Sequence, residues 1–252
     1  MRQQTKTTLI VSTRQTEDNQ LIWRAAIQRG WSVERVKGIR VPQIDGDQIV
    51  VYMESLFAPT VARQLGLELV ATPESWLPDL PEEYRRREVR LTTLGEVPKE
   101  QCPLFVKPPN EKSFSARVYD DIEQLLKDYQ PETAVLIASP VEWIAEFRCF
   151  CLDSRVRTLS PYLRNGQLSK LDGFAATYDE LEDAREFAER VLRDKRVEVP
   201  RAIVLDVGTI ADQGWAVVEA NAAWGSGIYG CEPNKVLNVL EHATVEYDER
   251  SH

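Results

Sequence analysis

The sequence has little histidine and no paired cysteines. Its 252 residues include two histidines, His242 and His252, and four cysteines, none in a CxxC pair. Nucleophilic triads and zinc sites depend on histidine or on closely spaced cysteines. The composition therefore excludes a histidine-dependent triad and a histidine-rich zinc site. Cys149 and Cys151 stand two apart in an apolar segment, where we expect them to pack as small apolar side chains in a reducing compartment.

Three other features are missing. No apolar run approaches the ~20 residues of a membrane span, and no signal-peptide core extends beyond Leu9-Ile10-Val11. The net charge is −9, and the only arginine run is Arg85-Arg86-Arg87, so a basic surface for nucleic acid is not expected. The GxGxxG fingerprint is absent, which disfavours a dehydrogenase. We expect a cytoplasmic protein that binds neither nucleic acid nor membrane.

The most informative stretch is 203–230, IVLDVGTIADQGWAVVEANAAWGSGIYG. It predicts two apolar strands joined by a turn at 211–214, with Asp206 on the first strand and Glu219 and Asn221 on the second. Glu219 and Asn221 share a strand face because they are two residues apart. A four-residue loop sets Asp206 opposite Glu219, and a loop two residues shorter sets it opposite Asn221. A loop of three would misplace these side chains.

Asp206, Glu219 and Asn221 form a candidate metal site. Charged side chains are almost never buried without a partner, so acids on adjacent apolar strands require one. Two carboxylates and an amide oxygen suit Mg²⁺, a hard cation that binds carboxylates together with substrate phosphates. The alternative is one acid at a strand end and a solvated Glu-Ala-Asn turn.

The first hundred residues predict a small α/β unit. Apolar strands at 7–12, 32–36 and 48–53 alternate with helices, which indicates a parallel sheet. Prolines mark 71–100 as a connecting stretch. Three of its arginines, Arg86, Arg87 and Arg90, either point into a cleft or form a solvated face.

The middle of the chain adds cationic residues at strand positions. The segment PLFVK ends a strand in Lys107, which suits a phosphate contact or an ordinary strand-end lysine reaching water. In VEWIAEFRCFC, Glu146 and Arg148 share one face of a strand, as a structural ion pair or as the wall of a site.

Taken together, these motifs carry a family resemblance. An FVKP strand, the loop KSFSA, the strand WIAEFR and the closing LDVG…VVEANAAWGSGIYG resemble the ATP-grasp fold, and more narrowly its R2K clade of bacterial and phage proteins, from Leu104 to Pro233. The resemblance implies an α+β / α/β fold in which two α+β lobes grip ATP, preceded by an N-terminal α/β lobe. The implied divisions are 1–100, 101–140 and 141–252. One departure is the loop PPNEKSFSA, which has no glycine where other ATP-grasp proteins are often glycine-rich.

The resemblance also implies roles for single residues. Lys107 and Arg148 are the implied catalytic residues, Lys107 at the nucleotide phosphates and Arg148 at the γ-phosphate or acyl-phosphate. Asp206, Glu219 and Asn221 match the family's magnesium ligands. The implied nucleotide-binding residues are Lys107, Lys112 in the phosphate-covering loop, Ser139 and Val141 at the hinge that meets adenine, and Glu142 as the ribose candidate.

The function that the resemblance implies is an ATP- and Mg²⁺-dependent ligase. It would join a carboxylate to an amine or thiol through an acyl-phosphate, with ATP and a small-molecule or peptide substrate as partners. Substrate identity and oligomeric state are left open. Two alternatives use the same ATP site: a kinase-like phosphoryl transferase, and a catalytically silent nucleotide-binding module.

Overall fold

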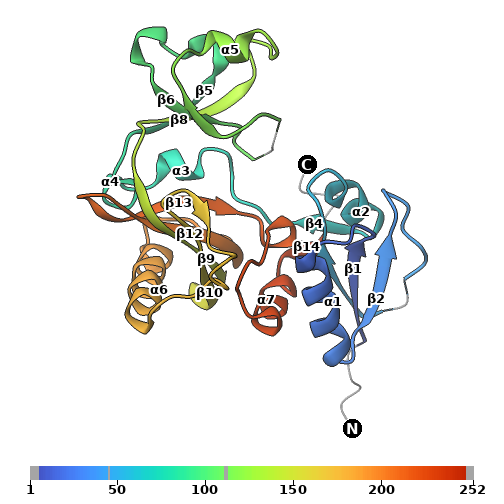
Figure 1. The fold of residues 1–252 in the computed structure, drawn as a ribbon. Helices are drawn as coiled ribbons and strands as arrows, with labels where there is room; N and C mark the ends of the chain where they lie inside the picture. Colours follow the sequence, from blue (N-terminus) through green and yellow to red (C-terminus); the bar gives the residue numbers. More distant parts are fainter. Residues whose placement is uncertain (1–5, 45, 111–112, 248–252) are drawn as a thin grey trace.

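The computed structural model describes residues 6–44, 46–110 and 113–247 (Figure 1). Within these ranges the chain forms an N-terminal lobe, a small upper lobe and a larger lobe built on an antiparallel sheet. The small lobe stands above the large sheet, and the N-terminal lobe lies beside it. This layered α and β organisation agrees with the predicted fold class.

The N-terminal lobe is built on a parallel sheet, as predicted. Its strands lie in the order β2-β1-β3, with β1 (Thr7–Ser12) buried at every residue between β2 (Ser32–Val36) and β3 (Gln48–Tyr52). The helices are α1 (Glu17–Gln28) and α2 (Ala58–Gln64). The following strand β4 (Leu67–Leu69) pairs with β14 (Thr244–Glu246), so a late segment of the chain closes on this lobe.

The connecting stretch leads into the small lobe. It contains α3 (Trp76–Asp79) and α4 (Glu82–Arg85), followed by β5 (Val89–Thr93), η1 (Leu94–Glu96) and η2 (Lys99–Gln101). The small sheet has the order β5-β8-β6-β7, with β6 (Leu104–Lys107), β7 (Arg117–Tyr119), α5 (Glu123–Leu126) and β8 (Ala134–Ala138). Because β5 pairs with β8, a division by sheet membership starts the small lobe at Val89, before the proposed border at 101.

The large lobe is built on a sheet of order β11-β10-β9-β12-β13. Its strands are β9 (Trp143–Leu152), β10 (Arg155–Arg164), β11 (Gln167–Leu168), β12 (Ala202–Ile210) and β13 (Gly214–Asn221). After β13 come η3 (Ala223–Gly225) and α7 (Pro233–Leu240).

The two faces of this sheet are buried against different partners. One face is covered by the long helix α6 (Tyr178–Arg193), which begins with a capping box between Thr177 and Glu180 and packs Ala188 against the face carrying Cys149. On the other face, Phe150 joins a core shared with α7 and the N-terminal lobe. That core holds the N-terminal lobe against one end of the sheet.

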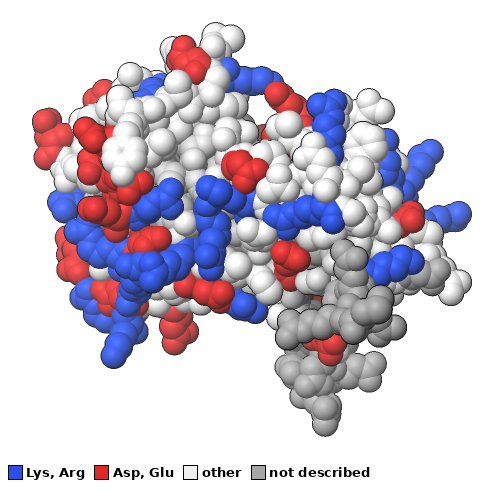
Figure 2. Space-filling model, turned by 90° about the horizontal axis from the view of Figure 1, so that it is seen from below, with Lys and Arg blue, Asp and Glu red and all other residues white. Residues whose placement is uncertain are grey.

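The surface mixes both signs of charge. On the face seen in Figure 2, acidic and basic side chains are interspersed. Across the described ranges, no helix is both long enough and apolar enough to cross a membrane.

Gly208 marks a close approach within the large sheet. A Cβ there would lie 2.6 Å from the Ala145 carbonyl oxygen and 2.9 Å from Cε3 of Trp143. We expect Gly208→Ala to lower the free energy of unfolding by about 1–3 kcal/mol, because a paired backbone and a packed indole would both have to shift. Urea unfolding measures this change.

Gly225→Ala is the matched control. Its added Cβ would meet only the Met53 carbonyl oxygen, at an ordinary 3.6 Å. Equal urea midpoints for the two variants would contradict the expected strain at Gly208.

Candidate functional site

A row of polar side chains crosses the large sheet. Ser160 of β10, Arg148 of β9, Asp206 of β12 and Glu219 of β13 are paired directly across adjacent strands. Their neighbours along the strands, such as Leu205, belong to the core under α6, so the row lies on the opposite face. The sheet thus brings residues more than 50 positions apart in sequence into contact.

Arg148 and Asp206 form the buried centre of this row. Arg148 donates from Nε to Asp206 Oδ1 at 3.0 Å and from Nη2 to Oδ2 at 2.6 Å, and Asp206 has no exposed surface. Burial alone would lower the pKa of Arg148, but the Asp206 carboxylate raises it well above its usual value. The guanidinium also lies over the rings of Tyr162 and Tyr229 and donates to the Gly227 carbonyl at 3.1 Å. Arg148 is therefore held as a cation in one orientation.

Lys107 reaches the row from the small lobe. Its ammonium forms an ion pair with Glu219 Oε2, and both side chains are mostly buried. Burial would raise the pKa of Glu219, but the Lys107 charge and hydrogen bonds from Lys107 and Asn221 lower it to about 2. Asn221 Nδ2 lies 2.9 Å from Glu219 Oε1 and 3.2 Å from Asp206 Oδ2. The structure thus gathers five sequence-predicted residues, Lys107, Arg148, Asp206, Glu219 and Asn221.

The β12–β13 hairpin has a shorter loop than a direct pairing of Asp206 with Glu219 requires. Asp206 is opposite Glu219, as a four-residue loop predicted, but the loop has three residues, 211–213. A register shift between Asp206 and Val207 corrects the pairing, because Val218 is an extra residue on β13. Both predicted loop lengths are therefore wrong, and of the two predicted pairings the structure forms the one with Glu219.

The trio of Asp206, Glu219 and Asn221 fits the donor set of a hard cation. Its side chains offer two carboxylates and one amide oxygen as possible metal ligands. The Asn221 amide lies between the two carboxylates. Rotating that amide by half a turn presents its oxygen instead of its nitrogen, since the two orientations are interchangeable assignments. In the described ranges no group of three His, Cys, Asp or Glu side chains could hold a metal, so the third protein ligand here would be an amide. The metal role of the trio stays a prediction.

Glu146 is a site residue whose role the sequence left undecided. It is 8% exposed and lies two residues before Arg148, on the same face of β9. It accepts a hydrogen bond from the Tyr162 hydroxyl at 2.7 Å. Burial raises the pKa of Glu146 to about 7, against the Tyr162 hydrogen bond. Its shared face with Arg148 was the available signal, and in the structure its hydrogen-bond partner on that face is Tyr162.

The predicted nucleotide residues other than Lys107 are more dispersed. A hollow beside Lys107 and Glu219 is lined by Pro109, Asn110, Leu136, Ala220 and the segment 72–77. Ser139, Val141 and Glu142 are not among the described residues that line it, and the Glu142 side chain is exposed. Lys112 lies outside the described residues.

The N-terminal lobe holds the loop that follows β13. Met53 N–H donates to the Trp224 carbonyl at 3.0 Å, and the Tyr52 hydroxyl donates to the Ser226 carbonyl at 3.0 Å. Asp18 accepts from the Ile228 N–H at 3.1 Å. Since Arg148 contacts Gly227 in the same loop, this lobe supports the site, which no sequence motif indicated.

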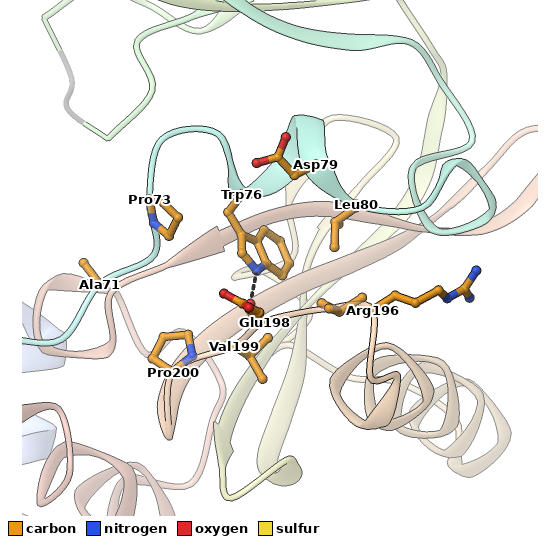
Figure 3. A pocket seen from close by; sticks show the side chains of 10 residues that line it. Ala71, Pro73, Trp76, Asp79, Leu80, Arg196, Glu198, Val199 and Pro200 are labelled. Carbon is orange, nitrogen blue, oxygen red and sulfur yellow. Dashed lines mark hydrogen bonds between the residues drawn. The ribbon is translucent and has the colours of Figure 1, made fainter.

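A second cavity lies on the other side of the connecting segment. It has a volume of about 510 Å³ and shares Pro73 and Trp76 with the hollow beside Lys107. In Figure 3 the Trp76 indole points toward the segment at Glu198, whose carbonyl accepts its N–H at 2.7 Å. The Asp79 and Arg196 side chains point away from the space. Polar and apolar groups contribute similarly to its lining, and none of its lining residues belongs to the polar row.

The fold is that of ATP-grasp proteins. A D-alanine–D-alanine ligase from Bacillus anthracis in complex with ATP has a TM-score of 0.55 and 13% identity, covering 95% of this chain and 97% of its own. The ATP-grasp ligase PsnB in complex with a minimal precursor has a TM-score of 0.53 and 14% identity, with 94% and 99% covered. An L-amino acid ligase from Bacillus licheniformis has a TM-score of 0.53 and 15% identity, with 99% and 78% covered.

The family is defined more narrowly by the sequence. The model of the ATP-grasp domain, R2K clade family 2, matches residues 84–239, and the chain belongs to this family. The match includes Lys107 and the whole polar row. Among curated proteins, no sequence matches the chain.

The raised pKa of Glu146 predicts a specific pH effect on stability. Between pH about 4.5 and 7 the folded chain keeps a proton on Glu146 that the unfolded chain has lost, so the free energy of unfolding falls as pH rises. Glu146→Gln cannot ionise. Relative to this variant, the unmodified chain should lose up to about 3 kcal/mol across that window.

Urea unfolding at pH 4.5 and pH 8 measures this difference. Glu142→Gln, a change at an exposed glutamate, is the control and should keep the pH dependence of the unmodified chain. The same pH dependence in Glu146→Gln would show that Glu146 ionises normally.

Proposed function

We propose that the chain is an ATP- and Mg²⁺-dependent ligase that joins a carboxylate to an amine or thiol through an acyl-phosphate. The supporting observation is the convergence of Lys107, Arg148, Asp206, Glu219 and Asn221 on one face of the large sheet. A nucleoside triphosphate with its metal ion requires cationic side chains for the phosphates and oxygen ligands for the metal, and this set supplies both. The names of the similar structures favour an amino acid or peptide substrate.

Each residue of the convergent set has a distinct task in this proposal. Asp206, Glu219 and Asn221 would hold Mg²⁺, which when bound offsets phosphate charge and orients the phosphate oxygens. Lys107 would exchange Glu219 for the nucleotide phosphates. Arg148, fixed by Asp206 and two tyrosine rings, would present its remaining N–H donors to the γ-phosphate.

The nucleotide assignments from the family resemblance complete the proposal. Ser139 and Val141 would offer backbone groups to the adenine edge, and Lys112 would cover the phosphates. Glu142 is the ribose candidate from the resemblance. Glu146, a buried carboxyl two residues from Arg148 on the same strand, is a second candidate for a ribose hydroxyl.

The proposed reaction has two steps. A substrate carboxylate oxygen attacks the γ-phosphorus, and the bond from that phosphorus to the bridging oxygen breaks to release ADP. An amine nitrogen or thiol sulfur then attacks the acyl carbon, the carbon–oxygen bond to phosphate breaks, and the nucleophile loses its proton. The chain contributes positioning and charge neutralisation, and neither step needs a protein nucleophile.

Product formation from a substrate pool tests this function. The purified chain is incubated with ATP, Mg²⁺ and a pooled amino-acid and peptide library, and products are identified by mass spectrometry. Condensation products with matching ADP are expected. Glu219→Gln should lower their rate by about 10²–10³, because one charged ligand of the phosphate site is lost.

Asp212→Asn is the matched control. It removes one negative charge from the same hairpin, at an exposed turn residue with φ 59°, a conformation that asparagine adopts readily. Its rate should equal that of the unmodified chain. ADP with a phosphorylated product and no condensation would instead indicate a kinase-like enzyme, and no ADP with any pool would overturn the proposal.

A further inference from the structure

The bulge in β13 decides which way its acidic end faces. Below the bulge, Trp215 and Val217 pack toward the core under α6, and above it Ala220 does so. The inward positions therefore change from odd to even numbers across Val218. This change is what places Glu219 and Asn221 on the face of Asp206.

Without the bulge, the same hairpin would lose the site. The pairing near the turn, Ile210 with Gly214 and Val207 with Val217, would continue and set Glu219 opposite Leu205. A one-residue slip turns each side chain to the other face of a sheet. Glu219 would then point into the apolar core, and Asp206 would lose both partners on β13.

Arg87 makes the contacts that hold the bulged segment. It donates from Nη1 to the Val217 carbonyl at 2.7 Å and from Nη2 to the Val218 carbonyl at 3.0 Å. β13 is the outer strand of its sheet, so these carbonyls lie on the edge without a further strand beside them. The planar fork of arginine can reach two adjacent carbonyls at once, which a lysine ammonium cannot reproduce.

Arg87 is itself held in place. Its guanidinium lies 5.0 Å from the ring centre of Trp143 and also donates to the Arg85 carbonyl at 3.0 Å. The preceding residue, Arg86, has a left-handed φ of 49° that ends α4. The side chain is thus fixed from two sides before it meets the bulge.

We propose that Arg87 is a positioning residue that stabilises the bulged register of β13 and so keeps Glu219 and Asn221 beside Asp206. Its relevance to catalysis rests on the proposed function of that trio, whereas its effect on the hairpin does not. Arg86 is a natural control, because it donates to the Trp215 carbonyl at 3.1 Å, on the regular side of the bulge, and its side chain is exposed.

Metal-dependent nucleotide binding is the first test. Calorimetry with the non-hydrolysable analogue AMP-PNP, at a series of Mg²⁺ concentrations, gives the concentration for half-maximal binding. Arg87→Ala and Arg87→Lys should each raise it by about tenfold or more, as for the loss of a residue that orients metal ligands. Arg86→Ala should leave it unchanged. An unchanged value in Arg87→Ala would overturn the proposal.

Deleting Val218 distinguishes two roles of Arg87, stabilisation of the bulged register and direct contact with the nucleotide. The deletion removes the extra residue, so Val217 stays opposite Val207 and Glu219 stays opposite Asp206 in a regular ladder. The Arg87→Ala change should then have little further effect on the Mg²⁺ requirement. An equal loss with and without Val218 would mean that Arg87 acts on the ligand directly, which contradicts the proposal.

Hydrogen exchange provides a readout that needs neither ligand nor activity. Amides of 217–221 should exchange faster in Arg87→Ala than in Arg86→Ala, because the bulged segment loses its two side-chain hydrogen bonds. Unchanged exchange would refute the bracing role even if the deletion variant does not fold. If the unmodified chain does not bind the nucleotide, the proposed function is wrong. The exchange measurement still tests whether Arg87 stabilises the bulged segment, because it needs no ligand.

Discussion

The carboxylate of Asp206 has no exposed surface, and the arrangement of the other site residues depends on it. Burying an unpaired carboxylate costs several kcal/mol, so the chain must place a cation beside it. Arg148 meets that need with two hydrogen bonds, and its position on the adjacent strand is possible only because β9 and β12 pair in this register. Removing either partner would leave the other as an uncompensated buried charge, so the pair acts as one unit.

The second ion pair links this centre to the small lobe. Lys107 belongs to β6 and Glu219 to β13, and each partner keeps some exposure, in contrast to Asp206. A partly exposed pair between two lobes is easier to exchange for a ligand than a buried one within a sheet. The N-terminal lobe adds a third support through Asp18 and Tyr52, which fix the loop that Arg148 contacts. All three lobes therefore converge on the same polar row.

Sequence patterns predicted the parallel N-terminal sheet and, of the polar row, Arg148, Asp206 and Glu219. They succeeded because acids on apolar strands conflict with local burial, and such conflicts mark sites. The three-residue loop and the compensating bulge were not predictable, since Val218 has no feature that distinguishes it from Val217. The sequence left two interpretations of Arg87 open, a residue that points into a cleft or one on a solvated face. Its carbonyl partners on β13 can be identified only from the tertiary structure. Glu146 shared a face with Arg148, but its burial and its Tyr162 partner depend on the pairing of β9 with β10.

The proposed function depends most on the trio of Asp206, Glu219 and Asn221 holding the metal of a bound nucleotide. The most direct measurement is anomalous diffraction from crystals grown with AMP-PNP and Mn²⁺ as a substitute for Mg²⁺. We expect an anomalous peak at roughly 2.0–2.3 Å from side-chain oxygens of all three residues and from phosphate oxygens. Ordered nucleotide with its Mn²⁺ peak away from the trio would contradict it.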